Sequence, residues 1–433
     1  MKHLLIFSFV LALCVAPVVA QQESAPSQPS AQDVAALVQQ IKDLQERVIS
    51  LEGKVRTLQS TQATPTAASP ETTQPATAPQ STETAGTATP TSRPEPSYGG
   101  AGGSAAKALN PDISVIGDFI GAAGRTDVPA LASQQAFPSL QMHESEIGLQ
   151  AIIDPYARGD FFISFGEEGV NLEEGYITFT ALPKGFVAKV GKMRSVFGKV
   201  NTMHNHVLPW IDRPLVSTNL VGGEDGINDA GFSIERIIPA PKGIFLEATG
   251  QLFRGDSADV FKSSQRSDVS AVAHLRGYKD ITESTNLDLG LSYARGHNDQ
   301  GTDFLTNLYG VDATLRWKPL RRSIYHSFIA RSEFTWSQRQ QLPREQNAFG
   351  FYTSADYQFA RRWFLGGRYD QSSRARFDNL TDKGGSIVLT YWPSEFSQIR
   401  GQYRVTNYAE NIRANEFMMQ LIFSLGAHGA HPF

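Results

Sequence analysis

Two repeat patterns divide the chain. Residues 34–58 (VAALVQQIKDLQERVISLEGKVRTL) carry apolar side chains at every a and d position of a heptad repeat. Branched residues at a and leucines at d predict an α-helical coiled coil over residues 31–60, and in isolated helices this arrangement favours a parallel dimer. A single amphipathic helix on a globular core is the alternative, but it would follow a period of about 3.6 rather than 3.5 residues.

From Pro111 onward, apolar and polar residues alternate with a period of two. Residues 285–295 and 397–406 show the alternation clearly, and turn-forming residues separate such segments. Strands of about ten residues with alternating polarity are typical of transmembrane β-barrels. The pattern predicts an all-β barrel of about sixteen antiparallel strands. Their expected ranges are 112–122, 141–153, 158–166, 172–182, 186–194, 229–238, 244–254, 268–277, 285–295, 304–317, 324–336, 347–359, 363–370, 384–392, 397–406 and 415–425.

The connections between these segments alternate in length. Every second one is short, at 154–156, 183–185, 239–243, 360–362 and 393–396. Those between them tend to be longer, at 123–140, 195–228, 255–267, 337–346 and 371–383, with 167–171 and 296–303 as exceptions. Outer-membrane barrels have short periplasmic turns and longer outer loops. The asymmetry therefore predicts that both ends of the barrel domain, residues 111–433, face the periplasm.

The first hundred residues predict export and a tether. Residues 1–20 join Lys2 to an apolar run that ends in small residues, which is typical of a signal peptide. Cys14, the only cysteine, leaves a lipid anchor as an alternative, whereas ordinary cleavage removes it and excludes disulfides. Residues 61–108 are rich in Thr, Pro and Ala and predict a disordered linker.

Composition excludes several classes of protein. A net charge of −4 gives no nucleic-acid footprint. No later apolar run is long enough for a transmembrane helix, so a membrane-spanning chain has to form a closed barrel.

A soluble β-sandwich or propeller is the alternative to a membrane barrel, but there is no blade-length repeat. Trp317, Trp336, Trp363 and Trp392 also lie at predicted strand ends, as in the aromatic girdles of membrane barrels. We find no GxSxG motif or ordered triad, and we predict no enzyme.

If the apolar side chains face lipid, the polar ones face a lumen, which in a barrel of about sixteen strands is wide enough to hold water. The predicted lumen and constriction residues are Glu174, Lys192, Arg194, Lys199, His204, His206, Asp212, Arg213, Arg276, Arg316, Arg331, Arg368, Arg400 and Arg404. Nearly balanced charges favour a solvated wall with cross-strand ion pairs, and a dedicated anion pathway is the alternative. Cations beside residues 195–228 support the hypothesis of a weak anion preference.

The segments LEEGYI (172–177), LPKG (182–185), VGK (190–192) and FG (197–198) resemble the phosphate-selective porin family. HNH (204–206), Trp210, DRPLV (212–216), DG (225–226) and FRGDS (253–257) resemble a closer group of outer-membrane proteins labelled zinc-regulated or TonB-dependent. The resemblance implies a trimeric diffusion channel whose third long loop, residues 195–228, folds into the barrel and narrows the pore. An active TonB-dependent receptor would also need a plug domain, which the residues before Pro111 cannot form.

The histidines of this loop raise the question of metal. His204 and His206, with Asp212 nearby, are residue types that bind zinc. Two histidines are fewer than the usual ligand set, so we expect no resident cofactor and keep zinc at His204 and His206 as the alternative.

Together these patterns predict a passive porin of the bacterial outer membrane that admits small solutes. A homotrimer embedded in outer-membrane lipid is expected, with the coiled coil in the periplasm pointing toward the cell wall, and nucleic acid is not an expected partner. Two alternatives stay open: an envelope tether that acts through the coiled coil, and a receptor that takes up a metal or its chelate.

Overall fold

The computed structural model describes residues 111–125, 137–166, 169–409 and 411–426. The predicted signal peptide (1–20), coiled coil (31–60) and linker (61–108) lie outside the described residues and stay predictions. Among the residues described, no helix has the length and apolar character needed to cross a membrane.

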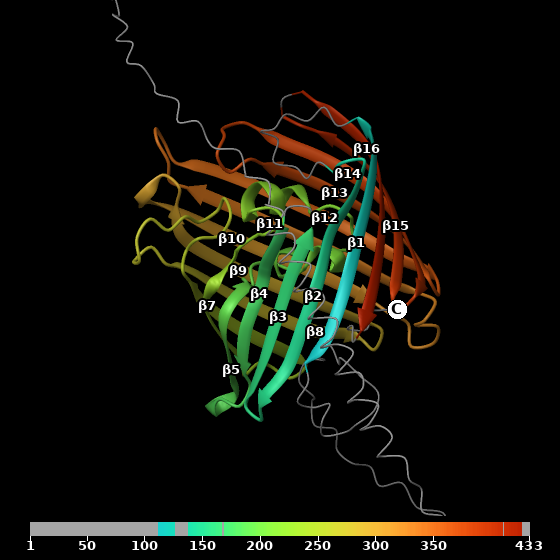
Figure 1. The fold of residues 1–433 in the computed structure, drawn as a ribbon, viewed down its shortest axis with the longest axis horizontal. Coiled ribbons are helices and arrows are strands. Elements are labelled where there is room, and N and C mark those ends of the chain that lie inside the picture. The colour runs from blue at the N-terminus through green and yellow to red at the C-terminus, as the bar shows by residue number, and fades with distance from the viewer. Residues whose placement is uncertain (1–110, 126–136, 167–168, 410, 427–433) are drawn as a thin grey trace, which may run out of the picture. The chain divides into compact units, whose positions relative to one another are not determined.

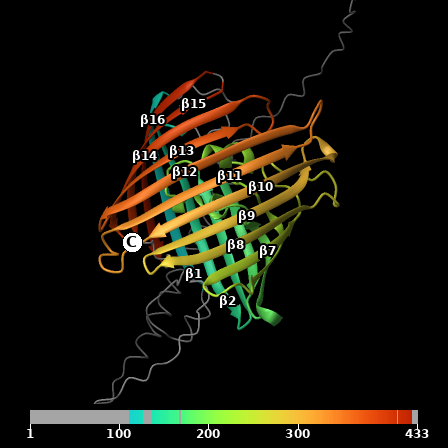
Figure 2. The same ribbon diagram turned by 180° about the vertical axis from the view of Figure 1, so that it is seen from behind.

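The described chain forms one closed barrel of sixteen antiparallel strands (Figures 1 and 2). Each strand pairs with its neighbours in sequence, and β1 pairs with β16 to close the sheet. The strands are β1 (Asp112–Arg125), β2 (Leu140–Asp154), β3 (Ala157–Gly166), β4 (Gly169–Phe179), β5 (Phe186–Arg194), β6 (Asn228–Ile238), β7 (Ile244–Phe253), β8 (Ser270–Thr282), β9 (Thr285–Asn298), β10 (Gly301–Trp317), β11 (Ser327–Arg339), β12 (Gln346–Ala360), β13 (Trp363–Ser373), β14 (Thr381–Ser394), β15 (Ser397–Asn407) and β16 (Arg413–Gly426). Each corresponds to one predicted strand, so the predicted barrel is confirmed.

The alternation of residue types explains the two surfaces of the wall. On β9, Leu289 and Leu291 are 47% and 55% exposed, whereas Asp288, which directly precedes Leu289, is 1% exposed. Successive side chains of a strand point to opposite faces of the sheet. The apolar set therefore covers the outside of the barrel and the polar set lies inside.

The predicted asymmetry of the connections holds with exceptions. At the end of the barrel where the described chain begins and finishes, the connections are 155–156, 180–185, 239–243, 283–284, 318–326, 361–362 and 395–396. The connections at the other end are 126–139, 167–168, 195–227, 254–269, 299–300, 340–345, 374–380 and 408–412. Residues 195–227 make the longest of these connections.

Strand-end tryptophans do not all face outward. Trp336 and Trp363 are exposed on the outer surface, where their rings lie against Phe349 and Tyr391. Trp392 is buried and alternates with Tyr391 along β14, so it lies on the inner face. The aromatic girdle predicted for strand ends therefore does not include Trp392.

Two β-bulges interrupt the alternation in neighbouring parts of the wall. The extra residue in β2 is His143, because the residues on either side of it are the ones paired with β1. The extra residue in β4 is Glu173, which the ladder with β3 leaves out in the same way. A bulge re-aims the side chains around it. As a result, the consecutive residues Glu173 and Glu174 are both buried.

Candidate functional site

The connection between β5 and β6, residues 195–227, is called the third loop here, and its two ends are joined at its base. The Ser195 N–H donates to the Ile227 carbonyl oxygen (2.8 Å) and continues the β5–β6 ladder. The Asn201 amide nitrogen donates to the carbonyl oxygens of both residues, and its oxygen accepts the Ile227 N–H (2.9 Å). Gly226 has a φ of +62°, and a Cβ there would stand 2.0 Å from Asn201 Oδ1. Glycine is needed at this position because only it fits both constraints.

The first attachment of the third loop to the wall is made on β9 and β11. The backbone N–H groups of Lys199 and Val200 donate to one carboxylate oxygen of Glu333 (2.6 and 2.7 Å). Lys199 Nζ also contacts Asp288 Oδ2 (2.8 Å), which Arg276 contacts as well. Charge-assisted hydrogen bonds of this kind fix the position of a segment.

The second attachment is made across the lumen, on β13 and β15. Asp212 Oδ2 accepts hydrogen bonds from Arg368 and Arg404 (2.8 Å each), and Asp212 Oδ1 accepts one from Gln402 (2.5 Å). Burial alone would raise the pKa of Asp212, but the two guanidinium groups outweigh it and lower that pKa to about 2. Asp212 therefore stays ionised at every ordinary pH and holds the loop against the wall.

Apolar packing accompanies the second attachment. Trp210 is fully buried, its ring lies edge-on to Tyr352 with centroids 5.2 Å apart, and the Arg368 guanidinium lies 4.8 Å above its centroid. The Trp210 carbonyl oxygen accepts a hydrogen bond from Arg400 (3.2 Å). Loop and wall together form a buried apolar cluster inside the barrel, made of Met193, Phe197, Val200, Leu208, Trp210, Val216, Leu220, Val221, Ile227, Phe253, Val260, Phe261, Val272, Ala294, Leu308, Ala348, Tyr352 and Val388.

Arg213 forms hydrogen bonds to other residues of the third loop. Its guanidinium donates to Asn205 Oδ1 (3.1 Å) and to the carbonyl oxygens of Val200 (3.1 Å) and Met203 (2.7 Å). Burial, and next the neighbouring charge of Arg194, lower the pKa of Arg213 to about 10, which still leaves it charged at neutral pH. Arg213 thus braces the loop internally.

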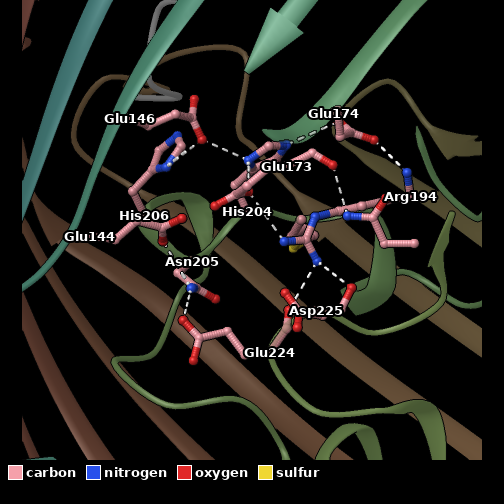
Figure 3. A network of polar contacts seen from close by, with 12 residues as sticks. Glu144, Glu146, Glu173, Glu174, Arg194, His204, Asn205, His206, Glu224 and Asp225 are labelled. Atoms are coloured by element: carbon pink, nitrogen blue, oxygen red, sulfur yellow. Dashed lines mark hydrogen bonds and ion pairs between the residues drawn. The ribbon is translucent and has the colours of Figure 1, made fainter. Parts of the chain in front are cut away.

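Between the third loop and the strands β2 and β4 lies a histidine–carboxylate cluster (Figure 3). His204 Nδ1 lies 2.7 Å from Glu146 Oε2 and 2.9 Å from Glu173 Oε2, while His204 Nε2 lies 3.1 Å from Glu174 Oε2. Burial disfavours a charged imidazole, but the hydrogen bonds to these three carboxylates outweigh it and raise the pKa of His204 well above its ordinary value. As these distances show, both ring nitrogens of His204 point at carboxylate oxygens.

The rest of the cluster consists of polar groups that hold these carboxylates. The Arg194 backbone N–H donates to Glu174 (2.5 Å), and its guanidinium contacts Glu173 (3.3 Å) and the carbonyl oxygens of Glu224 and Asp225 (3.0 Å each). Asn205 donates to Glu144 Oε2 (2.9 Å). Three elements (β2, β4 and β5) thus meet the third loop at one point (Figure 3).

The predicted zinc ligands are only partly brought together. His206 Nδ1 lies 3.8 Å from Glu146, and its ring centroid is 5.8 Å from that of His204. Asp212, however, belongs to the second attachment, with Arg368 and Arg404. Carboxylates of the wall lie beside His204 instead.

The predicted lumen arginines of strands β8 to β15 separate into two groups. Arg368, Arg400 and Arg404 face inward but are buried under the third loop. Arg276, Arg316 and Arg331 face inward with side chains 22%, 36% and 16% exposed. Cross-strand ion pairs, as predicted, join Arg404 to Glu416, Arg276 to Asp288 and Arg331 to Asp356.

The side chain of Lys192 does not face the lumen. Its strand register places it opposite Gly175 and Ala230, in the same alternation as the exposed Val190. Its Nζ contacts the Leu172 carbonyl oxygen (2.5 Å). The register therefore puts Lys192 on the outer face of the barrel and not, as the sequence predicted, in the lumen.

Sequence reasoning did not single out Glu144 and Glu173, which complete the histidine–carboxylate cluster. It also did not find a cavity of about 90 Å³ beside residues 218–222 of the third loop, lined among others by Arg339, Arg374 and Arg376. In this cavity Arg374 pairs with Asp382 (2.9 Å). Arginine spacing alone carried no signal for it, because Arg339 on β11 is far in sequence from Arg374 and Arg376 in the β13–β14 connection.

Fold and loop together define the class: a closed sixteen-stranded antiparallel barrel with a long loop attached inside it. The outer membrane channel DcaP of Acinetobacter baumannii is similar in structure, with a TM-score of 0.50 and 13% identity over 73% of this chain and 96% of that one. OmpTdeltaL8, a loop L8 deletion mutant of the Vibrio cholerae outer membrane protein OmpT, has a TM-score of 0.49 and 8% identity over 73% and 100% of the two chains.

At the level of sequence, a protein of Aquifex aeolicus (strain VF5) described as uncharacterized is 28% identical over 387 residues, which cover 76% of this chain and 81% of that protein. No family model matches the chain. The resemblance to the phosphate-selective porin family and to the zinc-regulated group therefore stays a prediction.

Proposed function

We propose that the chain is a porin of the bacterial outer membrane, a passive water-filled channel for small solutes. The observation that carries the proposal is the third loop, which is attached inside the barrel to Glu333 on one side and to Arg368 and Arg404 on another. A barrel of about sixteen strands is wide enough for an aqueous lumen. A loop fixed inside it limits the size of what passes.

Planar-bilayer recording of the purified protein tests the proposal. We expect discrete, ohmic conductance steps, because a passive channel needs no energy source. A variant lacking residues 197–225 should give larger steps, since the obstruction is removed while the Ser195–Ile227 junction is kept. A folded barrel that never conducts would refute the proposal.

A weak preference for anions is the finer part of the proposal. It is supported by Arg276, Arg316 and Arg331, whose side chains keep contact with solvent on the inner wall. Arg368 and Arg404 contribute little to it, because Asp212, Asp370 and Glu416 neutralise them. Charges on the wall of a narrow passage focus the local field and select the sign of the solute.

Reversal potentials in a salt gradient measure this preference. Arg316→Gln should shift the reversal potential toward cation preference, because Arg316 is the most exposed of the three and lies 3.7 Å from Asp288. Arg344→Gln is the matched control, since Arg344 is an exposed loop residue outside the wall. Equal reversal potentials in the two variants would leave anion preference without support.

We further propose a homotrimer. Strands β3 to β7 have 9–11 residues, whereas β8 to β12 have 13–17, so one side of the wall is lower than the other. A low wall is better covered by protein than by lipid, and a predicted coiled coil on the same axis would hold three copies together. Native mass spectrometry of the full chain measures the number of copies.

An envelope tether is the alternative from another class. It would act through residues 31–60, and deletion of residues 21–108 separates the two functions: a porin still conducts, whereas a tether loses its envelope phenotype. The third hypothesis, uptake of a metal or its chelate, is favoured by the carboxylates around His204. Radioactive zinc uptake by cells carrying the wild type or His204→Ala tests it.

A further inference from the structure

We infer that the histidine–carboxylate cluster is a binding site for one divalent transition-metal ion, which fastens the third loop to β2 and β4. The ligands are Glu146, Glu173 and His204, whose candidate donor atoms all lie within 4.8 Å of one another. The role is structural: the ion joins a loop residue to two strands of the wall. The inference does not depend on which solute the channel passes.

The first argument is the chemistry of the donor set. One imidazole nitrogen and two carboxylate oxygens form a mixed nitrogen and oxygen set that suits Zn²⁺ or Mn²⁺ better than Mg²⁺ or Ca²⁺, which prefer oxygen alone. His204 Nδ1 lies 2.7 and 2.9 Å from the two carboxylates. A metal at about 2.0–2.2 Å from each donor needs them only slightly further apart than they are.

The second argument is the other side of the imidazole ring. His204 Nε2 donates to Glu174 Oε2 (3.1 Å), and Glu174 is itself held by the Arg194 backbone N–H (2.5 Å). A metal-ligating histidine almost always donates its remaining N–H to a carboxylate or carbonyl group, which fixes the tautomer and the ring. Figure 3 shows His204 between Glu146 on one side and Glu174 on the other.

The third argument is a shortage of positive charge. The Glu144 and Glu173 carboxyl groups are within hydrogen-bonding reach of each other. Five carboxyl groups and three basic side chains interact most closely within the cluster, so acidic groups are in excess. They are Glu144, Glu146, Glu173, Glu174 and Glu224 against Arg194, His204 and Arg213. Beside the cluster, His143 lies 3.5 Å from Asp118 and 3.3 Å from Glu224.

Metal binding relieves this excess. The ion takes the place of the proton on His204 Nδ1, which is released, and the cluster gains one positive charge in the exchange. Buried carboxylates without sufficient counter-charge are costly. The single N–H of His204 Nδ1 is shared by the Glu146 and Glu173 carboxylates, whereas the ion forms a separate coordinate bond with each of these two carboxylates.

Calorimetry on the full-length protein in detergent tests the inference. The protein is stripped with a chelator and titrated with ZnCl₂ and, separately, MnCl₂. We expect one ion per chain, and at least tenfold weaker binding after Glu146→Gln or Glu173→Gln. Glu247→Gln is the matched control, because Glu247 is a buried carboxylate of the inner wall on β7, outside the cluster. His206→Asn should also bind normally, whereas a site made of both loop histidines would lose the ion.

Two outcomes overturn the inference: no saturable binding of either metal to the wild type, and wild-type affinity in both glutamine variants. If a variant fails to fold, anomalous diffraction from a crystal of the wild type soaked in MnCl₂ or ZnCl₂ decides instead. A peak between Glu146, Glu173 and His204 supports the site, and a peak only elsewhere refutes it. A protein that conducts but binds no metal would refute this inference and leave the proposed porin function intact.

Discussion

Asp212→Asn removes one charge from the second attachment of the third loop while keeping the size of the side chain. In the wild type, Arg368 and Arg404 both donate to Asp212 (2.8 Å each), and all three side chains are buried. In the variant, the two guanidinium groups lose a shared counter-charge. We expect the loop to leave the wall more often, while the barrel itself stays folded.

The size of the effect follows from the remaining partners. Removing one member of a buried ion pair costs about 3–5 kcal/mol. Arg368 keeps Asp370 (2.7 Å) and Arg404 keeps Glu416 (2.6 Å), which places the cost at the lower end. A loss of about 3 kcal/mol raises the undocked fraction of the loop roughly 100-fold, because 1.4 kcal/mol is a factor of ten.

Limited proteolysis with trypsin measures the undocked fraction, since cleavage after Lys199 or Arg213 requires the loop to open. The matched control is Asp225→Asn, the same chemical change in the same loop. The Asp225 side chain is exposed, and only its backbone carbonyl oxygen contacts Arg194. If Asp212→Asn is cleaved no faster than Asp225→Asn, the ion pairs do not hold the loop and the reasoning fails.

Three further predictions concern the same loop. The pKa of Asp212 is lowered from 3.8 to about 2, so the stabilisation that it gives the docked loop is fully present above pH 3.8 and is lost as pH falls through 2. Pepsin should therefore begin to cut the wild-type loop only near pH 2, whereas it should cut the loop of Asp212→Asn already at pH 4. Gly226→Ala should expose the loop to trypsin far more than Gly223→Ala, because both have positive φ but only Gly226 meets Asn201, at 2.0 Å; equal rates would contradict this. Trp210→Ala should cost about 3–5 kcal/mol of loop docking, measured as faster hydrogen exchange of residues 205–216, and unchanged exchange would show that its burial is not stabilising.

Much of the barrel was predictable because one physical rule, the alternation of side chains along a strand, applies to every segment after Pro111. The ends of the strands were less predictable. Residues 268–277 were predicted where β8 spans Ser270–Thr282, because its last four residues are all exposed and do not alternate. Lys192 was misplaced for a related reason. Its polarity suggested the lumen, but the register with Gly175 and Ala230 decides the face, and a single sequence does not show register.

The site was less predictable than the fold. His204 stood out as a candidate, but its partners come from strands more than twenty residues away, and their positions depend on the two bulges. A strict period of two turns only one of Glu173 and Glu174 inward, whereas the bulge in β4 buries both. Likewise Asp212 was expected beside the histidines because it is near in sequence, yet its charge is met by arginines across the lumen.

The junction at the base of the third loop makes the loop a removable cassette. Because Ser195 and Ile227 are already hydrogen-bonded as the last rung of β5 and β6, a two- or three-residue hairpin spliced between them would meet ends that are in register. The wall left behind would present Arg368, Arg400 and Arg404 to water, with Arg368 still paired with Asp370 and Arg404 with Glu416. An engineer would thus obtain a wide nanopore lined by ion pairs, whose transport properties come from residues that the intact protein keeps covered.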